Sequence, residues 1–201
     1  MIRVAIVEDQ LMLRSAICSL LELEPDITVV AQLDSGETAV DTLPSTGCDV
    51  VLLDVELPGD SGLDVAESLR KLPEPPLVMM LTTFRRPGYI RRALEAGACA
   101  YITKDAPVAE LAEAIRRAMA GEMLFSADQL RLGMSSGSNP LTERERDVLR
   151  AAQDYDTIPD IAEHLYLSVS TVSNYITAAI SKTDAQNRAH AIRVARDRGW
   201  L

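Results

Sequence analysis

Five polar residues at widely separated positions could together carry out phosphoryl chemistry. Three are acidic, one carries a hydroxyl and one an amine: Glu8, Asp9, Asp54, Thr82 and Lys104. A carboxylate can act as a nucleophile towards phosphorus, and clustered carboxylates are the hard oxygen ligands that suit Mg²⁺. A lysine and a hydroxyl can stabilise a transferred phosphoryl group. These residue types predict a metal-dependent phosphoryl-accepting site, provided that the fold brings them together.

The elements that would position these residues alternate between strands and helices. The predicted strands are residues 3–8, 27–32, 49–54, 77–82 and 100–103, and the predicted helices lie near 10–24, 36–43, 62–71, 88–96 and 107–119. The apolar run Val50–Leu53 is typical of a strand buried on both faces, and Pro58-Gly59 then forces a turn. Five β–α units of this length predict an α/β fold, a flavodoxin-like doubly wound parallel sheet of five strands.

In that fold the strands 3–8 and 49–54 are neighbours, and ligands bind at their carboxyl ends. Glu8, Asp9 and Asp54 should therefore meet within a few ångströms. Their mutual repulsion would raise at least one carboxyl pKa, so a divalent cation is the natural occupant. Thr82 as a strand end and Lys104 as a solvated charge each have an ordinary structural interpretation. Their joint placement at the same edge of the sheet makes coincidence improbable.

Composition limits the other classes of function. The formal net charge is −10, and eight basic and nine acidic residues lie in 141–201, so the excess of acid is in the N-terminal part. This charge does not by itself predict a nucleic-acid binder. Cys18, Cys48 and Cys99 are widely spaced, which favours a reducing compartment without a disulfide framework or a zinc site. With no signal-peptide pattern and no apolar run near the roughly 20 residues that span a bilayer, we expect a cytoplasmic protein without membrane insertion.

The C-terminal part has a different, all-helical pattern. Residues 133–140 are rich in glycine, serine and asparagine and predict a flexible linker. Thr142 and Glu145 then form a capping-box signature at a helix start. Four short helices fit the rest, at about 143–152, 158–165, 169–182 and 188–198.

The second and third of these helices resemble a helix-turn-helix. The apolar positions expected to be buried are Ile158, Ile161, Ala162 and Leu165 on the second helix and Val169, Val172, Ile176, Ala179 and Ile180 on the third. Outward positions of the third helix are small and polar: Ser170, Thr171, Asn174 and Ser181. Such side chains can reach base edges and phosphates. Periodicity alone also fits any three- or four-helix interaction domain.

Two families carry these motifs. Glu8-Asp9, Asp54 with Pro58-Gly59, Thr82 and Tyr101–Lys104 resemble the receiver domain of two-component response regulators over about residues 1–120. The motifs Leu141–Leu149, Ile161-Ala162 and Ser170–Val172 resemble the DNA-binding domain of the NarL/FixJ (LuxR-type) regulators over residues 141–201. The predicted domains are therefore a receiver at 1–122, a linker at 123–140 and a DNA-binding domain at 141–201. Leu81–Tyr89 and Gly199–Leu201 are also similar to regulators of membrane-lipid desaturation.

The receiver resemblance implies that Asp54 is phosphorylated by a sensor histidine kinase or a small phosphodonor. It implies Mg²⁺ held by Asp9, Asp54 and the backbone carbonyl of Glu56, with Glu8 acting through water. Lys104 would pair with the phosphoryl group and Thr82 would move to hydrogen-bond it. Tyr101 would change rotamer with the switch, and an ordinary packed tyrosine is the alternative.

The LuxR-type resemblance implies that double-stranded promoter DNA is read from Ser173, Asn174 and Thr177, with Thr171 and Lys182 nearer the backbone. The family often carries lysines at Ser173 and Thr177 and a glycine near Asp156, and this chain departs from all three. With one cation on the recognition helix, phosphate contacts are few. We therefore expect useful affinity to need a dimer on paired half-sites.

The expected mechanism is a two-state switch in which phosphorylation of Asp54 shifts the fourth and fifth β–α units and promotes homodimerisation. The helices Leu11–Leu23 and Val108–Met119 are candidate dimer faces, although core burial explains their apolar stripes equally well. The expected product is a transcription regulator without turnover of an external substrate. Two alternatives are a regulator that ignores phosphorylation and a phosphohydrolase of the haloacid-dehalogenase type, which Asp54-Val55-Glu56 superficially resembles.

Overall fold

The structure, a computed structural model, describes residues 1–83, 86–135 and 139–201. These form two compact units, one holding residues 1–133 apart from 86–88, and the other holding 134–201 together with 86–88. Phe84 and Arg85, within the stretch that resembles the desaturation regulators, lie outside the described residues. So do residues 136–138 of the expected linker.

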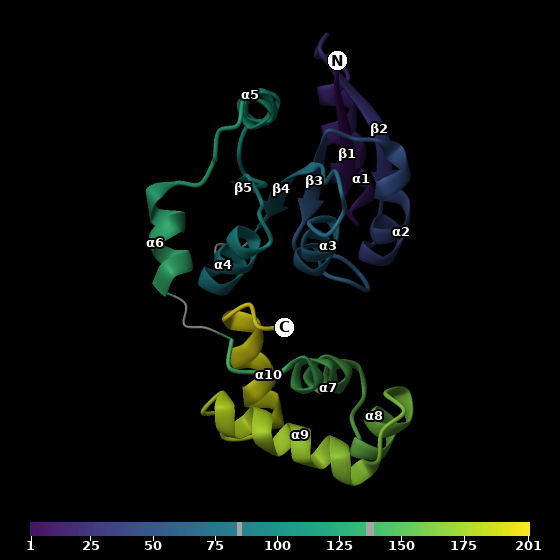
Figure 1. Ribbon diagram of the computed structural model, residues 1–201, viewed down its shortest axis with the longest axis vertical. Helices are drawn as coiled ribbons and strands as arrows, with labels where there is room; N and C mark the ends of the chain where they lie inside the picture. The colour runs from purple at the N-terminus through teal and green to yellow at the C-terminus, as the bar shows by residue number, and fades with distance from the viewer. Residues whose placement is uncertain (84–85, 136–138) are drawn as a thin grey trace. The chain divides into compact units, whose positions relative to one another are not determined.

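The first unit is built on a five-stranded parallel sheet (Figure 1). The strands are β1 (Ile2–Val7), β2 (Ile27–Leu33), β3 (Val50–Asp54), β4 (Leu77–Thr82) and β5 (Ala100–Thr103). Their order is β2-β1-β3-β4-β5, which is the flavodoxin-like order. The predicted fold class is confirmed, and every predicted strand agrees with the observed one to within one residue at each end.

Side chains alternate between the two faces of this sheet, and each face has its own apolar core. On one face, Val4 and Ile6 of β1 pack with the helices α1 (Leu11–Leu21) and α5 (Val108–Met119). On the other face, Ala5 and Val7 pack with α2 (Gly36–Thr46), α3 (Gly62–Leu69) and α4 (Pro87–Glu95). All five residues of β3 are buried, and the continuous apolar run Val50–Leu53 predicts this for the first four.

Local capping residues fix where several of these helices begin. The side chain of Ser35 accepts a hydrogen bond from the N–H of Thr38 at the start of α2, and Ser61 does the same for Asp64 at the start of α3. Helix α2 continues three residues beyond its predicted end, through Pro44. It stops at Gly47, whose positive φ of 59° is the conformation that glycine tolerates.

A further helix, α6 (Ala127–Ser135), lies within the segment expected to be linker. The helical structure therefore continues past Gly133, where the glycine- and serine-rich composition predicts a flexible chain. The sequence Ser126-Ala127-Asp128-Gln129 starts this helix, because the Ser126 hydroxyl accepts from the N–H of Gln129. The amide of Gln129 accepts in return from the N–H of Ser126.

The second unit contains the four predicted helices, α7 (Glu143–Asp154), α8 (Ile158–His164), α9 (Val169–Lys182) and α10 (Arg188–Asp197). The predicted capping box of Thr142 and Glu145 is present. Val172, Ile176 and Ala179 of α9 are buried as expected. The prediction for Val169 is wrong: it is 49% exposed, because the first turn of α9 extends beyond the apolar cluster.

Candidate functional site

Asp54 is the last residue of β3, and a close backbone contact fixes the chain around it. The turn after β3 brings Gly62, at the start of α3, directly against the carbonyl group of Asp54. A Cβ atom at this position would lie 1.7 Å from the Asp54 oxygen, so glycine is required. The N–H of Gly62 also donates to the carbonyl of Val55 at 3.0 Å. The segment that follows Asp54 is therefore held tightly against the end of the strand.

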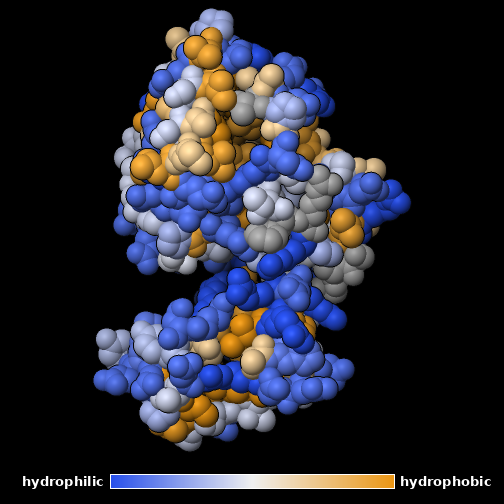
Figure 2. Space-filling model, turned by 180° about the vertical axis from the view of Figure 1, so that it is seen from behind, coloured by the Kyte–Doolittle hydropathy of each residue, from blue (hydrophilic) through white to orange (hydrophobic). Residues whose placement is uncertain are grey.

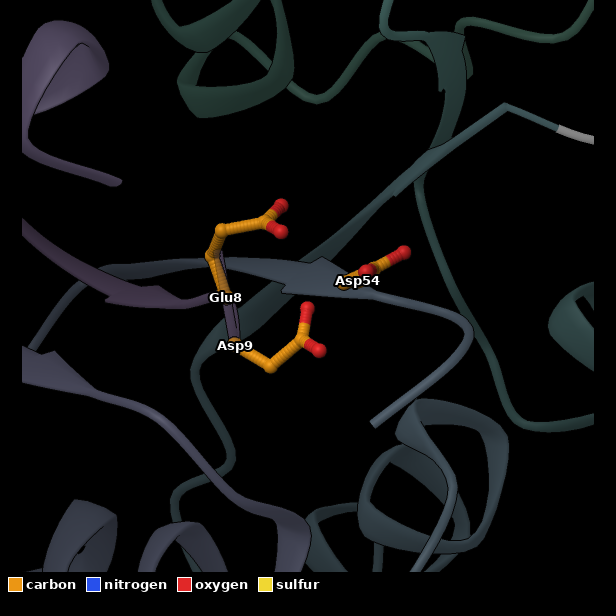
Figure 3. A group of neighbouring side chains, drawn as sticks. All are labelled: Glu8, Asp9 and Asp54. Carbon is orange, nitrogen blue, oxygen red and sulfur yellow. The ribbon is translucent and has the colours of Figure 1, made fainter. Parts of the chain in front are cut away.

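Three carboxylates meet at this point (Figure 3). Glu8 and Asp9 follow β1 and Asp54 ends β3, and one oxygen of each lies within 4.8 Å of the others. Glu8 is fully buried and Asp54 is 4% exposed, whereas Asp9 faces solvent. The convergence expected from the strand order is present, and Asp9 leaves the group open to water on one side.

Lys104 bridges the two buried carboxylates. Its Nζ atom lies 2.8 Å from Oδ2 of Asp54 and 2.6 Å from Oε2 of Glu8, and its side chain is 8% exposed. The backbone N–H of Lys104 donates to the carbonyl of Thr82 at 2.9 Å. Thr82 is buried and follows Leu81, the residue of β4 that pairs with Asp54. The ends of β1, β3, β4 and β5 thus bring all five predicted residues to one edge of the sheet.

Burial governs the protonation of this cluster. Burial raises the pKa of Glu8, with a smaller contribution from the Asp54 charge, despite the opposing bond from Lys104. Burial likewise raises the pKa of Asp54, and Asp9 adds to the effect. Burial alone would lower the pKa of Lys104, but its bonds to Asp54 and Glu8 outweigh this, so the pKa is raised. The lysine is therefore held as an ammonium ion between two carboxyl groups that resist ionisation.

The donor set fits a divalent cation. Three carboxylates and one ammonium leave two negative charges when all are ionised, which a divalent cation balances. Hard oxygen ligands with one side open to water are those that Mg²⁺ prefers. The N–H of Glu56 donates to Oδ1 of Asp54 at 3.3 Å, so this peptide adjoins the cluster. The Glu56 side chain is exposed, which does not suit the second acid of a haloacid-dehalogenase site.

Tyr101 lies on β5, three residues before Lys104, and is 2% exposed. Its ring centroid is 6.3 Å from that of Phe125, and its carbonyl accepts from Nε2 of Gln129 at 2.9 Å. Sequence reasoning singled out Tyr101 but missed both of these neighbours. The only signal for Gln129 was the capping pattern of Ser126 and Gln129, which shows a helix start and does not reveal the bond to Tyr101.

The candidate nucleic-acid surface is on α9. Leu167 donates from its N–H to the carbonyl of Ala162, and Tyr166 takes a positive φ of 54°, so α8 and α9 are joined by a tight turn. Sequence reasoning missed Ser168, which caps α9 by accepting from the N–H of Thr171 at 3.1 Å. Of the residues assigned to DNA contact, Ser170, Asn174, Thr177 and Lys182 are exposed, and Thr171 and Ser173 are half-buried. The Thr177 hydroxyl donates to the carbonyl of Ser173 at 2.9 Å.

Lys182, the one basic residue of α9, is bound within the domain. Its Nζ atom lies 2.8 Å from each carboxylate oxygen of Glu145. Glu145 is 4% exposed and is also the capping-box residue of α7. Its pKa is lowered: burial would raise the pKa, but the bonds from Lys182 and Thr142 outweigh burial. The cation of the recognition helix thus fixes α9 against the start of α7.

Comparison with known families decides the identity of the two units. A model described as "Response regulator receiver domain" matches residues 4–116, and a model described as "Bacterial regulatory proteins, luxR family" matches residues 139–195. The chain belongs to the LuxR-type response regulators. This response regulator joins a receiver to a LuxR-type DNA-binding domain, the organisation of a transcriptional regulator.

The response regulator also has relatives that match it along the whole chain. It is 46% identical to "Uncharacterized transcriptional regulatory protein YvfU" and 42% identical to "Transcriptional regulatory protein DesR", both of Bacillus subtilis (strain 168), over 100% of each chain. Among solved structures it is similar to "Response Regulator ChrA in Heme-Sensing Two Component System", with 30% identity, coverage of 100% and 98% of the two chains, and a TM-score of 0.56. Within the described part of the response regulator, no helix combines the length and apolar character needed to cross a membrane.

Proposed function

We propose that this response regulator accepts a phosphoryl group on Asp54 from a sensor histidine kinase and then dimerises on promoter DNA in the cytoplasm. The supporting observation is the group of Glu8, Asp9, Asp54 and Lys104, in which a buried carboxylate lies beside an ammonium ion and two further acids. In the transfer, a carboxylate oxygen of Asp54 bonds to phosphorus while the bond from phosphorus to the donor breaks. The donor keeps that electron pair.

Each residue of the pocket would have its own role in the phosphoryl transfer. Asp9, Asp54 and the Glu56 carbonyl would hold Mg²⁺ directly and Glu8 through water, and when bound the ion neutralises the negative charge of the transferred group. Lys104 is already within 2.8 Å of Asp54 and would bond to the phosphoryl oxygens. The Thr82 hydroxyl would complete these bonds. Regulation, rather than turnover of an external substrate, is the proposed outcome.

Dimerisation is proposed to use the face formed by α1 and α5. Large apolar side chains of this face are exposed: Leu11 by 68%, Met12 by 87%, Leu20 by 42% and Met119 by 43%. Figure 2 shows hydrophobic side chains gathered on the visible face of the receiver. The two helices pack over the same face of the sheet, so these residues form one surface of the receiver. Exposed apolar groups of this size favour burial in an interface.

The DNA contacts are proposed to come from Ser170, Thr171, Ser173, Asn174 and Thr177 on α9, with Lys182 at the C-terminal end of the same helix. These side chains are mostly neutral, so each protomer would make few ionic contacts with phosphate. Pairing two recognition helices on adjacent half-sites would supply the missing affinity.

The test is intact-mass measurement and sedimentation of the wild type, Asp54→Ala and the control Asp60→Ala, an exposed acid of the same loop, with acetyl phosphate and Mg²⁺. The wild type and Asp60→Ala should gain the mass of one phosphoryl group and dimerise. Asp54→Ala should do neither. An adduct on Asp54→Ala, or dimers that form without any adduct, would contradict the proposal and favour a phosphorylation-independent regulator.

The proposed dimer face has its own test. Leu20→Glu places a charge on the exposed side of α1, away from the phosphoacceptor pocket. It should leave the phosphoryl adduct intact and abolish the dimer in the same sedimentation experiment. If Leu20→Glu dimerised as well as the wild type, the dimer interface would lie on another face of the receiver.

A further inference from the structure

The segment Met123–Gly133, which follows α5, returns over the receiver and covers β5 and α4. Leu124 pairs with Ala100 as an additional parallel bridge. Its N–H donates to the carbonyl of Cys99 at 2.7 Å, and its carbonyl accepts from the N–H of Tyr101 at 3.3 Å. The backbone of the segment therefore continues the sheet beyond β5.

Gln129 attaches the segment to Tyr101 by a side-chain bond. One end of its amide, Oε1, accepts from the N–H of Ser126 at 2.7 Å and so orders the start of α6. The other end, Nε2, donates to the carbonyl of Tyr101 at 2.9 Å. Phe125, which directly precedes Ser126, packs on the core beside the Tyr101 ring. One side chain thus orders the helix and holds it to β5.

The far end of the segment rests on α4 (Figure 1). A Cβ atom at Gly133 would lie 3.2 Å from Cγ2 of Ile90 and 3.4 Å from Cδ1 of Leu94. These distances are shorter than ordinary contacts between carbon atoms, which are near 3.5–4.0 Å. The absence of a side chain at Gly133 therefore allows α6 to lie this close to α4.

Both elements beneath the segment, β5 and α4, are connected to Asp54 or to its loop by side-chain contacts. Along β5, Tyr101 is followed after two residues by Lys104, whose ammonium group bonds to Asp54. Along α4, Arg92 is buried and its Nη2 lies 2.9 Å from Oδ1 of Asp64. Asp64 accepts from the hydroxyl of Ser61, the residue that caps α3 in the loop after Asp54. A change at Asp54 can reach the segment by two connected sets of contacts.

We propose that Met123–Gly133 is a regulatory clamp, with Gln129 as its positioning residue. The clamp holds the unphosphorylated arrangement of β5 and α4, and the phosphoryl group on Asp54 competes with it by drawing Lys104 and Thr82 towards its own oxygens. This inference rests on the proposed phosphorylation of Asp54. Because coupling between two sites is reciprocal, breaking the clamp must tighten the binding of a phosphoryl group or its analogue at Asp54.

Gln129→Glu tests the bond between Gln129 and Tyr101 most directly. A carboxylate at this position can still accept from the N–H of Ser126, so the helix cap is kept, but it cannot donate to the Tyr101 carbonyl. Gly133→Ala is a second variant that forces the far end of α6 away from α4 by a single methyl group. Arg131→Gln changes an exposed side chain of the same helix and is the control, since its side chain is 78% exposed.

Two measurements on the full chain test the clamp. Hydrogen exchange follows the amides of Met123–Gly133, and calorimetry with Mg²⁺ gives the affinity for beryllofluoride, a phosphoryl analogue. In the wild type, beryllofluoride should reduce the protection of this segment. In Gln129→Glu and Gly133→Ala, protection should already be low without it, and beryllofluoride should bind about fivefold tighter or more, the lower end of typical coupling. Arg131→Gln should match the wild type.

The contrary outcomes separate the possible failures. If Gln129→Glu lost protection yet bound beryllofluoride with wild-type affinity, docking of the segment would be structural only. If Gln129→Glu bound beryllofluoride more weakly than the wild type, the clamp would stabilise the phosphorylated arrangement instead. If the hydrogen-exchange protection of the segment did not change in this variant, Gln129 would not hold the segment. A wild type that bound no beryllofluoride would refute the proposed function itself, and the clamp with it.

Discussion

The proposed phosphoacceptor pocket and the proposed recognition helix use charge in opposite ways. In the pocket, the side chains of Glu8, Asp54 and Lys104 are all buried, and the Nζ atom of Lys104 lies within 3 Å of both carboxylates. On α9, the side chains assigned to DNA contact are mostly neutral, and the one cation is bound to Glu145. Charge interactions are strong where water is excluded and weak where it is not. The pocket therefore places its charges where they interact strongly, whereas the proposed DNA contacts on α9 are weak and spread along a helix.

This difference explains why regulation would act through pairing. A recognition helix with few phosphate contacts gains little from a single encounter with DNA, and a second copy on the adjacent half-site multiplies that gain. The pocket, in contrast, responds strongly to one added phosphoryl group because its charges are buried together. The following variants test this difference between the pocket and α9.

Removing the ammonium group of the pocket should have the largest effect on stability. Lys104→Met leaves Glu8 and Asp54 buried without their partner and should cost about 3–5 kcal/mol of unfolding free energy at neutral pH. The pKa of both acids is already raised above the ordinary 4.5 and 3.8, and the variant raises it further. An acid with a raised pKa costs stability when ionised, so the loss should shrink as the pH falls through that raised pKa.

Calorimetric unfolding at several pH values, without Mg²⁺, measures this loss. The matched control is Lys71→Met, which removes an exposed lysine of the same unit and should change stability by less than about 0.5 kcal/mol. A pH-independent loss in Lys104→Met would show that packing, rather than charge, stabilises the pocket.

The cap of the recognition helix should have a smaller effect. Ser168→Ala removes the oxygen that accepts from the N–H of Thr171 and should cost about 1 kcal/mol, whereas Ser168→Gly should cost only a few tenths. Urea denaturation of both variants provides the measurement. Equal losses in the two variants would mean that the hydroxyl does more than cap the helix.

Lys182→Met should have the smallest effect, and it decides how the cation of α9 is used. Because Lys182 is 36% exposed, its bonds to Glu145 should contribute less than about 1 kcal/mol. If Glu145 is its main partner, the salt dependence of binding to duplex DNA of random sequence should not change. A slope reduced by about one would instead assign Lys182 to a phosphate contact. Adding Glu145→Gln to this variant should cause little further loss.

The sequence predicts the pocket well because each of its residues is marked by local structure. Glu8, Asp54 and Thr82 end apolar runs or lie next to their ends, so the strand order alone brings them together. The convergence with Asp9 and Lys104 then follows from the parallel arrangement of the strands.

The contacts that the sequence does not predict are side-chain bonds between distant elements. Gln129 bonds to a carbonyl 28 residues away, and Lys182 bonds to a carboxylate 37 residues away. A capping pattern identifies Gln129 and Glu145 as helix-start residues, yet nothing local names their second partners. The exposure of Val169 was missed for a related reason, since apolar spacing does not show where the neighbouring helices end.

The extra bridge at Leu124 has a consequence for the association of this protein with other chains. It occupies the N–H of Tyr101 and the carbonyl of Cys99, two backbone groups at the outer edge of the sheet. An open sheet edge can add strands from other molecules, either as specific recognition or as aggregation. If the segment leaves on activation, the activated form exposes a strand that can pair with an extended peptide. The lifetime of the phosphoryl group would then also limit how long the protein is open to such pairing.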